Sequence, residues 1–105
     1  MAVFGDQVRI KLTGETEQLG LAGREGVVFG FTTPSITGVE VIGSPRDDYA
    51  LNVNFDDTNE NFWFSDDLVE FVDVGAGQVM RLDGVEQEWV RLPNGEWEQR
   101  PLGKN

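Results

Sequence analysis

ALNVNFDDTNENFWFS, residues 50–65, is the stretch that decides the fold, because two apolar segments flank a polar turn. Up to residue 55, apolar side chains alternate strictly with asparagines, which is the period of a strand with one buried face. The run DDTNEN at 56–61 is rich in turn-forming residues, and FWF follows it. The sequence therefore predicts a β-hairpin, and the side chains expected to face inward on its first strand are Leu51, Val53 and Phe55.

The return strand of this hairpin places Trp63 on the outer face. If residues 56–61 form the turn, Phe55 lies opposite Phe62, and Trp63 lies beside Asn54. An exposed tryptophan has two explanations. It anchors a partner, since tryptophan is enriched at binding hot spots, or the C-terminal residues after 75 fold back and bury it. Both explanations stay open on the sequence, and the first makes Trp63 a candidate site residue.

The N-terminal half predicts three further strands. Within residues 6–12, apolar side chains alternate with basic ones from Val8 on, and residues 26–33 form a largely apolar run before Pro34 ends it. Between them, the glycine-rich and polar residues 13–25 predict a long loop without a helix. A third strand begins at Val39. The side chains expected in the core from the first two strands are Val8, Ile10, Leu12, Val27, Phe29 and Phe31.

Residues 65–73 predict the end of this unit. Ser65 followed by two aspartates is typical of the N-cap and first turn of a short helical segment, since acidic side chains are favourable at a helix N-terminus. LVEFVD at 68–73 then resumes as a strand. Short strands, one long early loop and a helical turn are typical of a small closed barrel of five strands, which we expect to span residues 1–74.

Residues 75–105 predict a separate extension. DG at 83–84 and NG at 94–95 are hairpin signals, because type I′ turns require positive φ at both central positions. The three strands expected around them are 78–82, 85–92 and 96–100. Two-residue loops would create two ion pairs, Arg81 with Glu86 and Arg91 with Glu98. A three-stranded meander of this size is marginal alone, so we expect it to pack on the barrel.

Four segments carry a family resemblance: GDQVRI (5–10), GREGVV (23–28), LNVNF (51–55) and FSDDLVEFVD (64–73). They resemble the SH3-like barrels of the KOW type and of subunit IV of photosystem I. The resemblance covers residues 4–73 and implies an all-β fold, a five-stranded SH3-like barrel. The C-terminal three-stranded β-meander extension has no counterpart in these families and is predicted from its turn signals alone. The resemblance also implies a non-catalytic barrel that docks on a larger protein or ribonucleoprotein assembly. RNA binding and ferredoxin docking are not carried over, because those families use basic side chains where this chain is acidic.

The composition argues against catalysis. The chain has no cysteine and no histidine, which removes the usual thiolate nucleophile, the usual general base and the commonest zinc ligands. Asp57, Asn59 and Asn61 match the first three alternating ligands of a calcium loop, but Phe62 and Leu68 stand where such a loop needs Gly and Glu. We therefore expect no enzyme activity, no cofactor and no metal site.

Charge is concentrated in the middle of the chain, whose net charge is −11. Between residues 47 and 73 there are nine acidic residues and no Lys or Arg, while both flanks are nearly balanced. Such a surface repels nucleic-acid phosphates and anionic lipids and attracts a basic partner. The alternative, that the acids only keep a small β protein soluble, stays open. No apolar run approaches the ~20 residues of a membrane span, so we expect no membrane insertion. We also expect a cytoplasmic monomer that does not bind nucleic acid directly.

These observations lead to one hypothesis and one alternative. The leading hypothesis is a protein-interaction module or small accessory subunit, an adaptor that docks on a basic partner protein. The alternative is an acidic mimic of nucleic acid that inhibits a DNA-binding enzyme. The candidate partner-binding residues are the aromatics Trp63 and Tyr49 and the acids Asp47, Asp48, Asp56, Asp57 and Glu60.

Overall fold

The computed structural model describes residues 2–102 and divides into two compact units, Met1–Val72 and Asp73–Asn105. They are named unit 1 and unit 2, and each is described by itself. Residue 1, where the predicted barrel begins, and residues 103–105, where the predicted extension ends, lie outside the described residues. Within the described part of the chain, no helix is long and apolar enough to cross a membrane.

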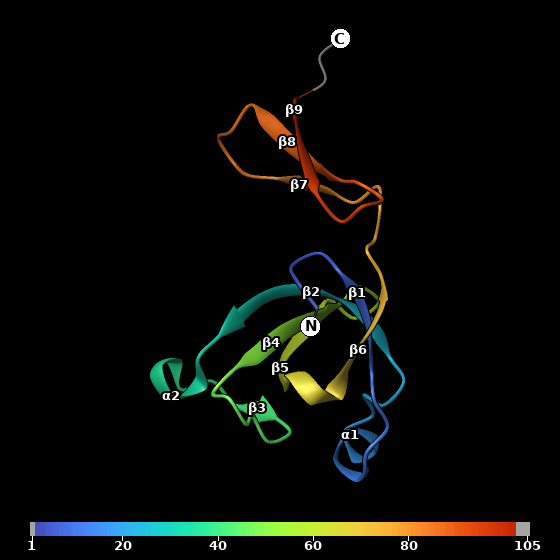
Figure 1. Cartoon of the computed structure of the whole chain (residues 1–105), viewed down its shortest axis with the longest axis vertical. Coiled ribbons are helices and arrows are strands. Elements are labelled where there is room, and N and C mark those ends of the chain that lie inside the picture. Colours follow the sequence, from blue (N-terminus) through green and yellow to red (C-terminus); the bar gives the residue numbers. More distant parts are fainter. Residues whose placement is uncertain (1, 103–105) are drawn as a thin grey trace. The chain divides into compact units, whose positions relative to one another are not determined.

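Unit 1 is a curled sheet with short helical segments in its connections (Figure 1). Its elements are β1 (Gln7–Ile10), α1 (Gly14–Gln18), β2 (Glu25–Thr32), α2 (Pro34–Thr37), β3 (Val41–Ile42), β4 (Ala50–Phe55), β5 (Glu60–Ser65), the 3₁₀ turn η1 (Asp66–Leu68) and β6 (Val69–Asp73). The strand order is β3-β5-β4-β2-β1-β6. The all-β class is confirmed. Each of the six segments predicted as a strand forms one, so the sheet has six strands where a barrel of five was expected, and the two-residue β3 pairs in parallel with β5.

Strand β4 forms the centre of the core. Leu51, Val53 and Phe55 are fully buried, as predicted, and burial of each such side chain contributes about 1.5–3 kcal/mol. The asparagines between them were expected on a solvated face, yet Asn52 and Asn54 are only 9% and 6% exposed. Neighbouring strands flank them on both sides, because β4 is an inner strand between β2 and β5, and Asn52 Nδ2 donates to Asn61 Oδ1 at 3.3 Å. The other large side chains of this core are Val8, Ile10, Leu21, Val28, Phe64 and Leu68.

The β4–β5 hairpin has a shorter turn than predicted. Phe55 lies opposite Glu60, two residues before its expected partner, and Trp63 lies opposite Asn52. Asn59 is the cause, because it adopts a positive φ of 58° and its backbone N–H donates to the Phe55 carbonyl at 2.7 Å. The turn thus closes over residues 56–59, and the predicted position of Trp63 beside the other asparagine of β4 is wrong.

Strand β2 turns the opposite face to the core from the one predicted. Val28 is fully buried, whereas Phe29 is 51% and Phe31 41% exposed. A Cβ on Gly26 would lie 2.4 Å from the Asn54 carbonyl oxygen, so the side of β2 that carries Gly26 approaches β4 closely. A register shift between residues 28 and 30 then leaves Phe29 outside the regular pairing. The two phenylalanines are therefore surface residues and not core residues.

The segment predicted to be a plain loop contains helix α1. Thr13 and Thr16 form a reciprocal capping box, in which each side-chain hydroxyl accepts a hydrogen bond from the other residue's backbone N–H. The buried Thr16 hydroxyl also donates to the Lys11 carbonyl at 2.7 Å, which fixes the helix to the end of β1. Because β1 ends at Ile10, Leu12 lies beyond the sheet and is 71% exposed, contrary to the prediction.

Unit 2 is a three-stranded antiparallel sheet in the order β7-β8-β9. Its strands are β7 (Val79–Arg81), β8 (Gln87–Arg91) and β9 (Trp97–Pro101). Arg81 pairs with Glu88 at 2.7 Å, and the Arg91 guanidinium lies over the Trp97 ring, 5.3 Å from its centroid. The predicted partners, Glu86 for Arg81 and Glu98 for Arg91, are wrong, because both turns are longer than two residues. Packing of this extension on the barrel stays a prediction.

Candidate docking surface

Strand β4 separates the predicted acidic residues into two groups. Six residues of strand at about 3.3 Å each span roughly 20 Å. Asp47 and Asp48 precede β4, and the pairing of Ala50 with Ser65 brings Asp66 and Asp67 to the same end of the strand. The acids of the β4–β5 turn lie at the opposite end. We name the first group the Tyr49 end (Arg46, Asp47, Tyr49, Asp66, Asp67) and the second the Phe55 end (Arg24, Phe55, Asp57, Thr58, Glu60).

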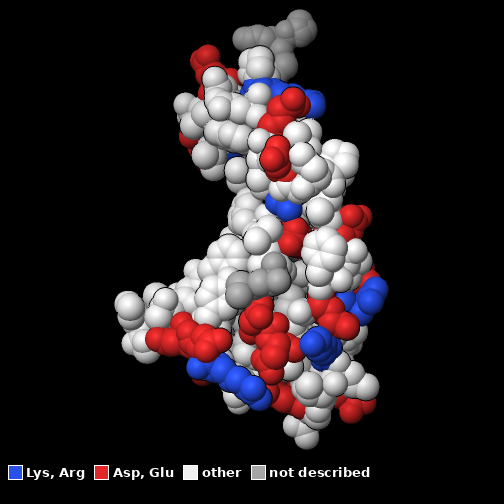
Figure 2. Space-filling model, in the orientation of Figure 1, with Lys and Arg blue, Asp and Glu red and all other residues white. Residues whose placement is uncertain are grey.

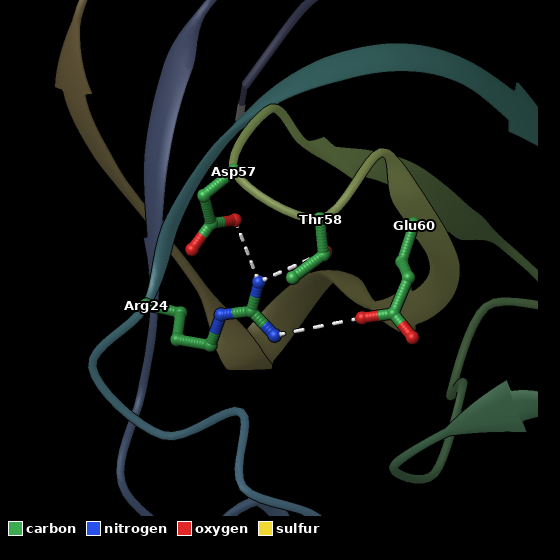
Figure 3. A network of polar contacts seen from close by, with 4 residues as sticks. All are labelled: Arg24, Asp57, Thr58 and Glu60. Atoms are coloured by element: carbon green, nitrogen blue, oxygen red, sulfur yellow. Dashed lines mark hydrogen bonds and ion pairs between the residues drawn. The ribbon is translucent and has the colours of Figure 1, made fainter.

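At the Phe55 end, one arginine engages the acidic turn (Figure 3). The Arg24 guanidinium contacts Asp57 Oδ1 at 2.8 Å and Glu60 Oε1 at 3.9 Å, and it donates to the Thr58 hydroxyl at 3.3 Å. The same guanidinium lies over the Phe55 ring, 4.4 Å from its centroid. A guanidinium held by carboxylates above an aromatic face is a favourable arrangement for arginine. The charges of Asp57 and Glu60 are therefore partly neutralised within the chain.

The remaining acid of that turn, Asp56, is exposed and borders a shallow hollow of about 330 Å³. Gln7, Glu25 and Gly26 also line this hollow. Glu25 is already engaged, because Arg9 Nη2 contacts its Oε2 at 2.6 Å. Of the three acids predicted here as partner-binding residues, Asp56 is the one for which the described residues supply no ion pair.

At the Tyr49 end, the side chains surround a hollow of about 340 Å³, lined by Arg46, Asp47, Tyr49, Asp66 and Asp67. Among residues 2–102, the three aspartates of this hollow form no ion pair, although Arg46 lies beside them. Figure 2 shows acidic side chains gathered on the viewed face of unit 1 in the region of α2 and η1, with basic surface next to them. The carboxylates of the Tyr49 end thus remain available to a cation from outside the chain.

Tyr49 joins this hollow to an exposed aromatic surface. Its ring stacks on Phe31, with centroids 5.7 Å apart and an interplanar angle of 18°. Partial burial, and secondly the negative charge of Asp66, raise the pKa of Tyr49 above its ordinary value of 10. The phenol therefore stays protonated at neutral pH beside a carboxylate. The structure brings Tyr49 and Asp47 together, as the predicted site requires, and adds Asp66 and Asp67, which the sequence did not single out as site residues.

Asp48 has a local partner. It adopts a positive φ of 54°, and its Oδ1 accepts a hydrogen bond from the Ser35 backbone N–H at 2.9 Å. The Ser35 hydroxyl donates to the other oxygen of the same carboxylate. These bonds fix helix α2 against the loop that precedes β4, and α2 carries Ile36, whose side chain is 81% exposed. In the structure, Asp48 therefore positions α2 and does not line the hollow of the Tyr49 end.

Trp63 lies apart from both acidic groups, near the middle of β5. It is half-buried and lines a third hollow of about 530 Å³ together with Leu19, Val39, Glu40, Ile42, Asn61 and Phe62. Val41 of the edge strand β3 is its neighbour in parallel pairing. The seven predicted site residues thus occupy separate places along β4 and β5 and do not line one common hollow. That the extension covers Trp63 stays a prediction.

Comparison with known proteins gives no relative for this chain. No protein-family model matches it, and searches of curated proteins and of solved structures found no similar protein. Within residues 2–102, no group of three or more acidic side chains is arranged to hold a metal ion. Function is therefore inferred from the residues of the Tyr49 end themselves.

Proposed function

We propose that this chain is a non-catalytic protein-interaction module, an adaptor or accessory subunit, that docks on a basic segment of a partner protein through its Tyr49 end. The fold proposed for unit 1 is the SH3-like barrel. One observation carries the proposal: three carboxylates without an ion pair surround a hollow whose wall is an aromatic ring. Aromatic rings supply contact area at low entropic cost, and unpaired acids select a partner of opposite charge.

The contrast between the two ends supports this choice of surface. At the Phe55 end, Arg24 already occupies the position that a partner's cation would take. At the Tyr49 end, the exposed side chains of Phe31 and Ile36 lie on the elements adjoining the hollow, which gives a mixed apolar and acidic surface. Mixed surfaces of this kind are typical of transient protein interfaces, which combine an apolar centre with a charged rim.

The test uses a basic peptide and two matched charge variants of the full chain. The peptide is a twelve-residue Gly/Ser peptide carrying three arginines and three lysines, and its binding is mapped by amide chemical shifts in 0.15 M salt. The first variant, Asp47→Asn/Asp66→Asn/Asp67→Asn, removes three charges from the Tyr49 end. The control, Asp56→Asn/Asp57→Asn/Glu60→Gln, removes three charges from the β4–β5 turn.

We expect the peptide to shift the amides of residues 46–49 and 66–67. Affinity should fall at least about tenfold, which is 1.4 kcal/mol, in the first variant, and should change little in the control. Equal losses in both variants would show attraction to net charge alone and would contradict the proposal. The nucleic-acid mimic stays the alternative. It would be favoured if the chain inhibited a DNA-cleaving enzyme and the control variant lost that inhibition as fully as the first.

A further inference from the structure

We infer that the hollow at the Tyr49 end is an arginine-selective subsite, which takes the planar guanidinium of an arginine from the partner protein in preference to the ammonium of a lysine. This inference rests on the proposed function and specifies the residue that the partner presents. It does not follow from negative charge alone, because carboxylates attract both cations. It follows from the pairing of the carboxylates with one aromatic ring.

The Phe55 end provides an arrangement of the same composition within the same chain. There, a guanidinium lies over an aromatic ring, 4.4 Å from the Phe55 centroid, and its nitrogens reach two carboxylates and a hydroxyl. The Tyr49 end has the same classes of group: one aromatic ring, three carboxylates and the phenolic hydroxyl. The difference is that Arg24 supplies the cation at the first site, whereas no arginine forms an ion pair at the second among the described residues.

The ring at the Tyr49 end is held in place before a ligand arrives. Tyr49 both lines the hollow and stacks on Phe31, so its orientation is set by a neighbour from β2. The hydrogen bonds of Asp48 to Ser35 fix the backbone immediately before it. A preordered ring lowers the entropic cost of binding a flexible side chain. Asp66 lies close enough to Tyr49 to contribute to its raised pKa, so the field that would stabilise a cation reaches the ring.

The chemistry of the two candidate cations then decides between them. A guanidinium is planar and weakly hydrated, so it stacks on a ring while its N–H groups donate to carboxylates at its edge. A lysine ammonium is a compact, strongly hydrated charge that gains less from the aromatic face. A hollow of about 340 Å³ lies at the lower end of the range for ligand pockets, which suits a single side chain.

Arg46 is the other possible occupant, since it lines the same hollow. Its side chain is exposed and forms no ion pair with the aspartates around it, in contrast to Arg24 at the Phe55 end. A partner's arginine would therefore compete with a cation that the site does not hold by a direct ion pair. Replacing Arg46 by serine should strengthen binding of an arginine peptide by about twofold to fivefold, which is within the range of a surface charge interaction.

The experiment compares two peptides that differ in the cation alone. Both are nine-residue Gly/Ser peptides with three basic residues, all arginine in one and all lysine in the other, titrated against the full chain in 0.15 M salt. We expect the arginine peptide to bind at least threefold more tightly at residues 46–49 and 66–67. The preference should disappear in Tyr49→Leu, which removes the ring, and persist in Phe29→Leu, which removes an exposed ring of β2 outside the hollow.

The outcomes separate the inference from the proposed function. If both peptides bind the Tyr49 end with equal affinity, the arginine subsite is wrong while the docking surface stands. If neither peptide perturbs this end, both are wrong. Should Tyr49→Leu fail to fold, Asp66→Asn provides a second variant that leaves the aromatic packing in place. It should reduce the arginine preference, and an unchanged preference would also contradict the subsite.

Discussion

The two ends of strand β4 carry similar residues, but among the described residues the carboxylates are paired with an arginine at one end only. At the Phe55 end, Arg24, which directly precedes β2, lies over an aromatic ring and contacts two carboxylates. At the Tyr49 end, an aromatic ring and three carboxylates surround a hollow, and the neighbouring arginine forms no ion pair with them. A segment rich in acidic residues therefore does not by itself locate a binding surface. What matters is which carboxylates the fold has already paired.

The two rings also differ in what they do for the fold. Phe55 is fully buried and packs against Phe62 and Phe64 at centroid distances of 6.3 and 6.2 Å. Tyr49 is half-buried and stacks on the exposed Phe31. One ring therefore belongs to the core and supports an arginine on its outer side. The other belongs to the surface and supports the wall of a hollow, so the two ends should respond differently to truncation.

Truncating the two rings should produce the largest difference. We expect Phe55→Ala to lower the free energy of unfolding by about 3–5 kcal/mol, because it removes a fully buried ring and leaves a cavity. Tyr49→Ala should cost about 1–2 kcal/mol, since its ring is partly solvated in the folded state. Urea denaturation of both variants measures this. Equal losses would mean that the Tyr49 ring belongs to the core, which would remove the distinction between the two ends.

The backbone behind the Tyr49 end should be the next most sensitive feature. Gly43 has a φ of 101°, and a Cβ there would lie 2.1 Å from Ser65 Oγ and 2.8 Å from Leu68 Cδ1. Gly38, with a φ of 74°, is the matched control, because a Cβ there meets nothing within 4 Å. We expect Gly38→Ala to cost about 1–2 kcal/mol from backbone conformation alone. Gly43→Ala should cost about 1–3 kcal/mol more from overpacking.

The displacement caused by Gly43→Ala should also reach the hollow. Ser65 directly precedes the 3₁₀ turn that carries Asp66 and Asp67, so pushing Ser65 aside moves two carboxylates of the Tyr49 end. The arginine peptide should therefore bind Gly43→Ala more weakly than Gly38→Ala. If the two glycine variants were equally stable and bound the peptide equally, the close approach of Gly43 to Ser65 would have no role in positioning this end.

Local patterns in the sequence were sufficient for the elements that depend on near neighbours. The alternation in β4 identified its three core side chains, and the serine followed by two aspartates identified the turn η1. The helix α1 was missed because its capping box uses threonine at both positions, which is a weaker signal than the usual glutamate partner. The register of the β4–β5 hairpin depended on one residue, Asn59, which adopts a positive φ.

The remaining errors came from contacts between distant residues. VVFGF in β2 fits a strand with either face buried, and the close approach of Gly26 to β4 decides between them. Likewise, Arg24 and Asp57 are 33 residues apart, so no local pattern shows that Arg24 pairs with the acidic turn. The sequence singled out Tyr49 and Asp47 of the candidate site but not Asp66 and Asp67, and it could not show the division into a paired and an unpaired end. That division depends on the antiparallel pairing of β2 with β4.

Double-mutant cycles should detect the difference in pairing directly. For Arg24→Met and Asp57→Asn, we expect a coupling energy of about 0.5–1 kcal/mol, because the contact is 2.8 Å long but solvent-exposed. For Arg46→Met and Asp66→Asn, the coupling should be near zero, since these side chains form no ion pair. Denaturant unfolding of the unmodified chain, the four single variants and the two double variants provides the values. A coupling at Arg46 equal to that at Arg24 would show that the Tyr49 end is already occupied.

The smallest expected effect concerns the ionisation of Tyr49, and it can be measured cleanly because Tyr49 is the single tyrosine of the chain. Partial burial and then Asp66 raise its pKa above 10 in the folded protein. Asp66→Asn should therefore lower this pKa, but not to the ordinary value, since the effect of burial remains. Asp57→Asn, at the other end of β4, should leave it unchanged. Absorbance titration of the phenolate measures all three proteins.

The same shift determines how stability responds to alkaline pH. The unfolded chain loses the tyrosine proton near pH 10, whereas the folded chain retains it to higher pH, so the contribution of Tyr49 is fully present below pH 10. It should decrease as pH rises from 10 through the raised pKa of the folded state, and the decrease should be smaller in Asp66→Asn.

An arginine peptide bound in the hollow would bring a positive charge beside the phenol and lower its pKa. A lowered Tyr49 pKa with the arginine peptide, absent in Asp47→Asn/Asp66→Asn/Asp67→Asn, would place the cation at the ring. An unchanged pKa in the bound state would place it elsewhere.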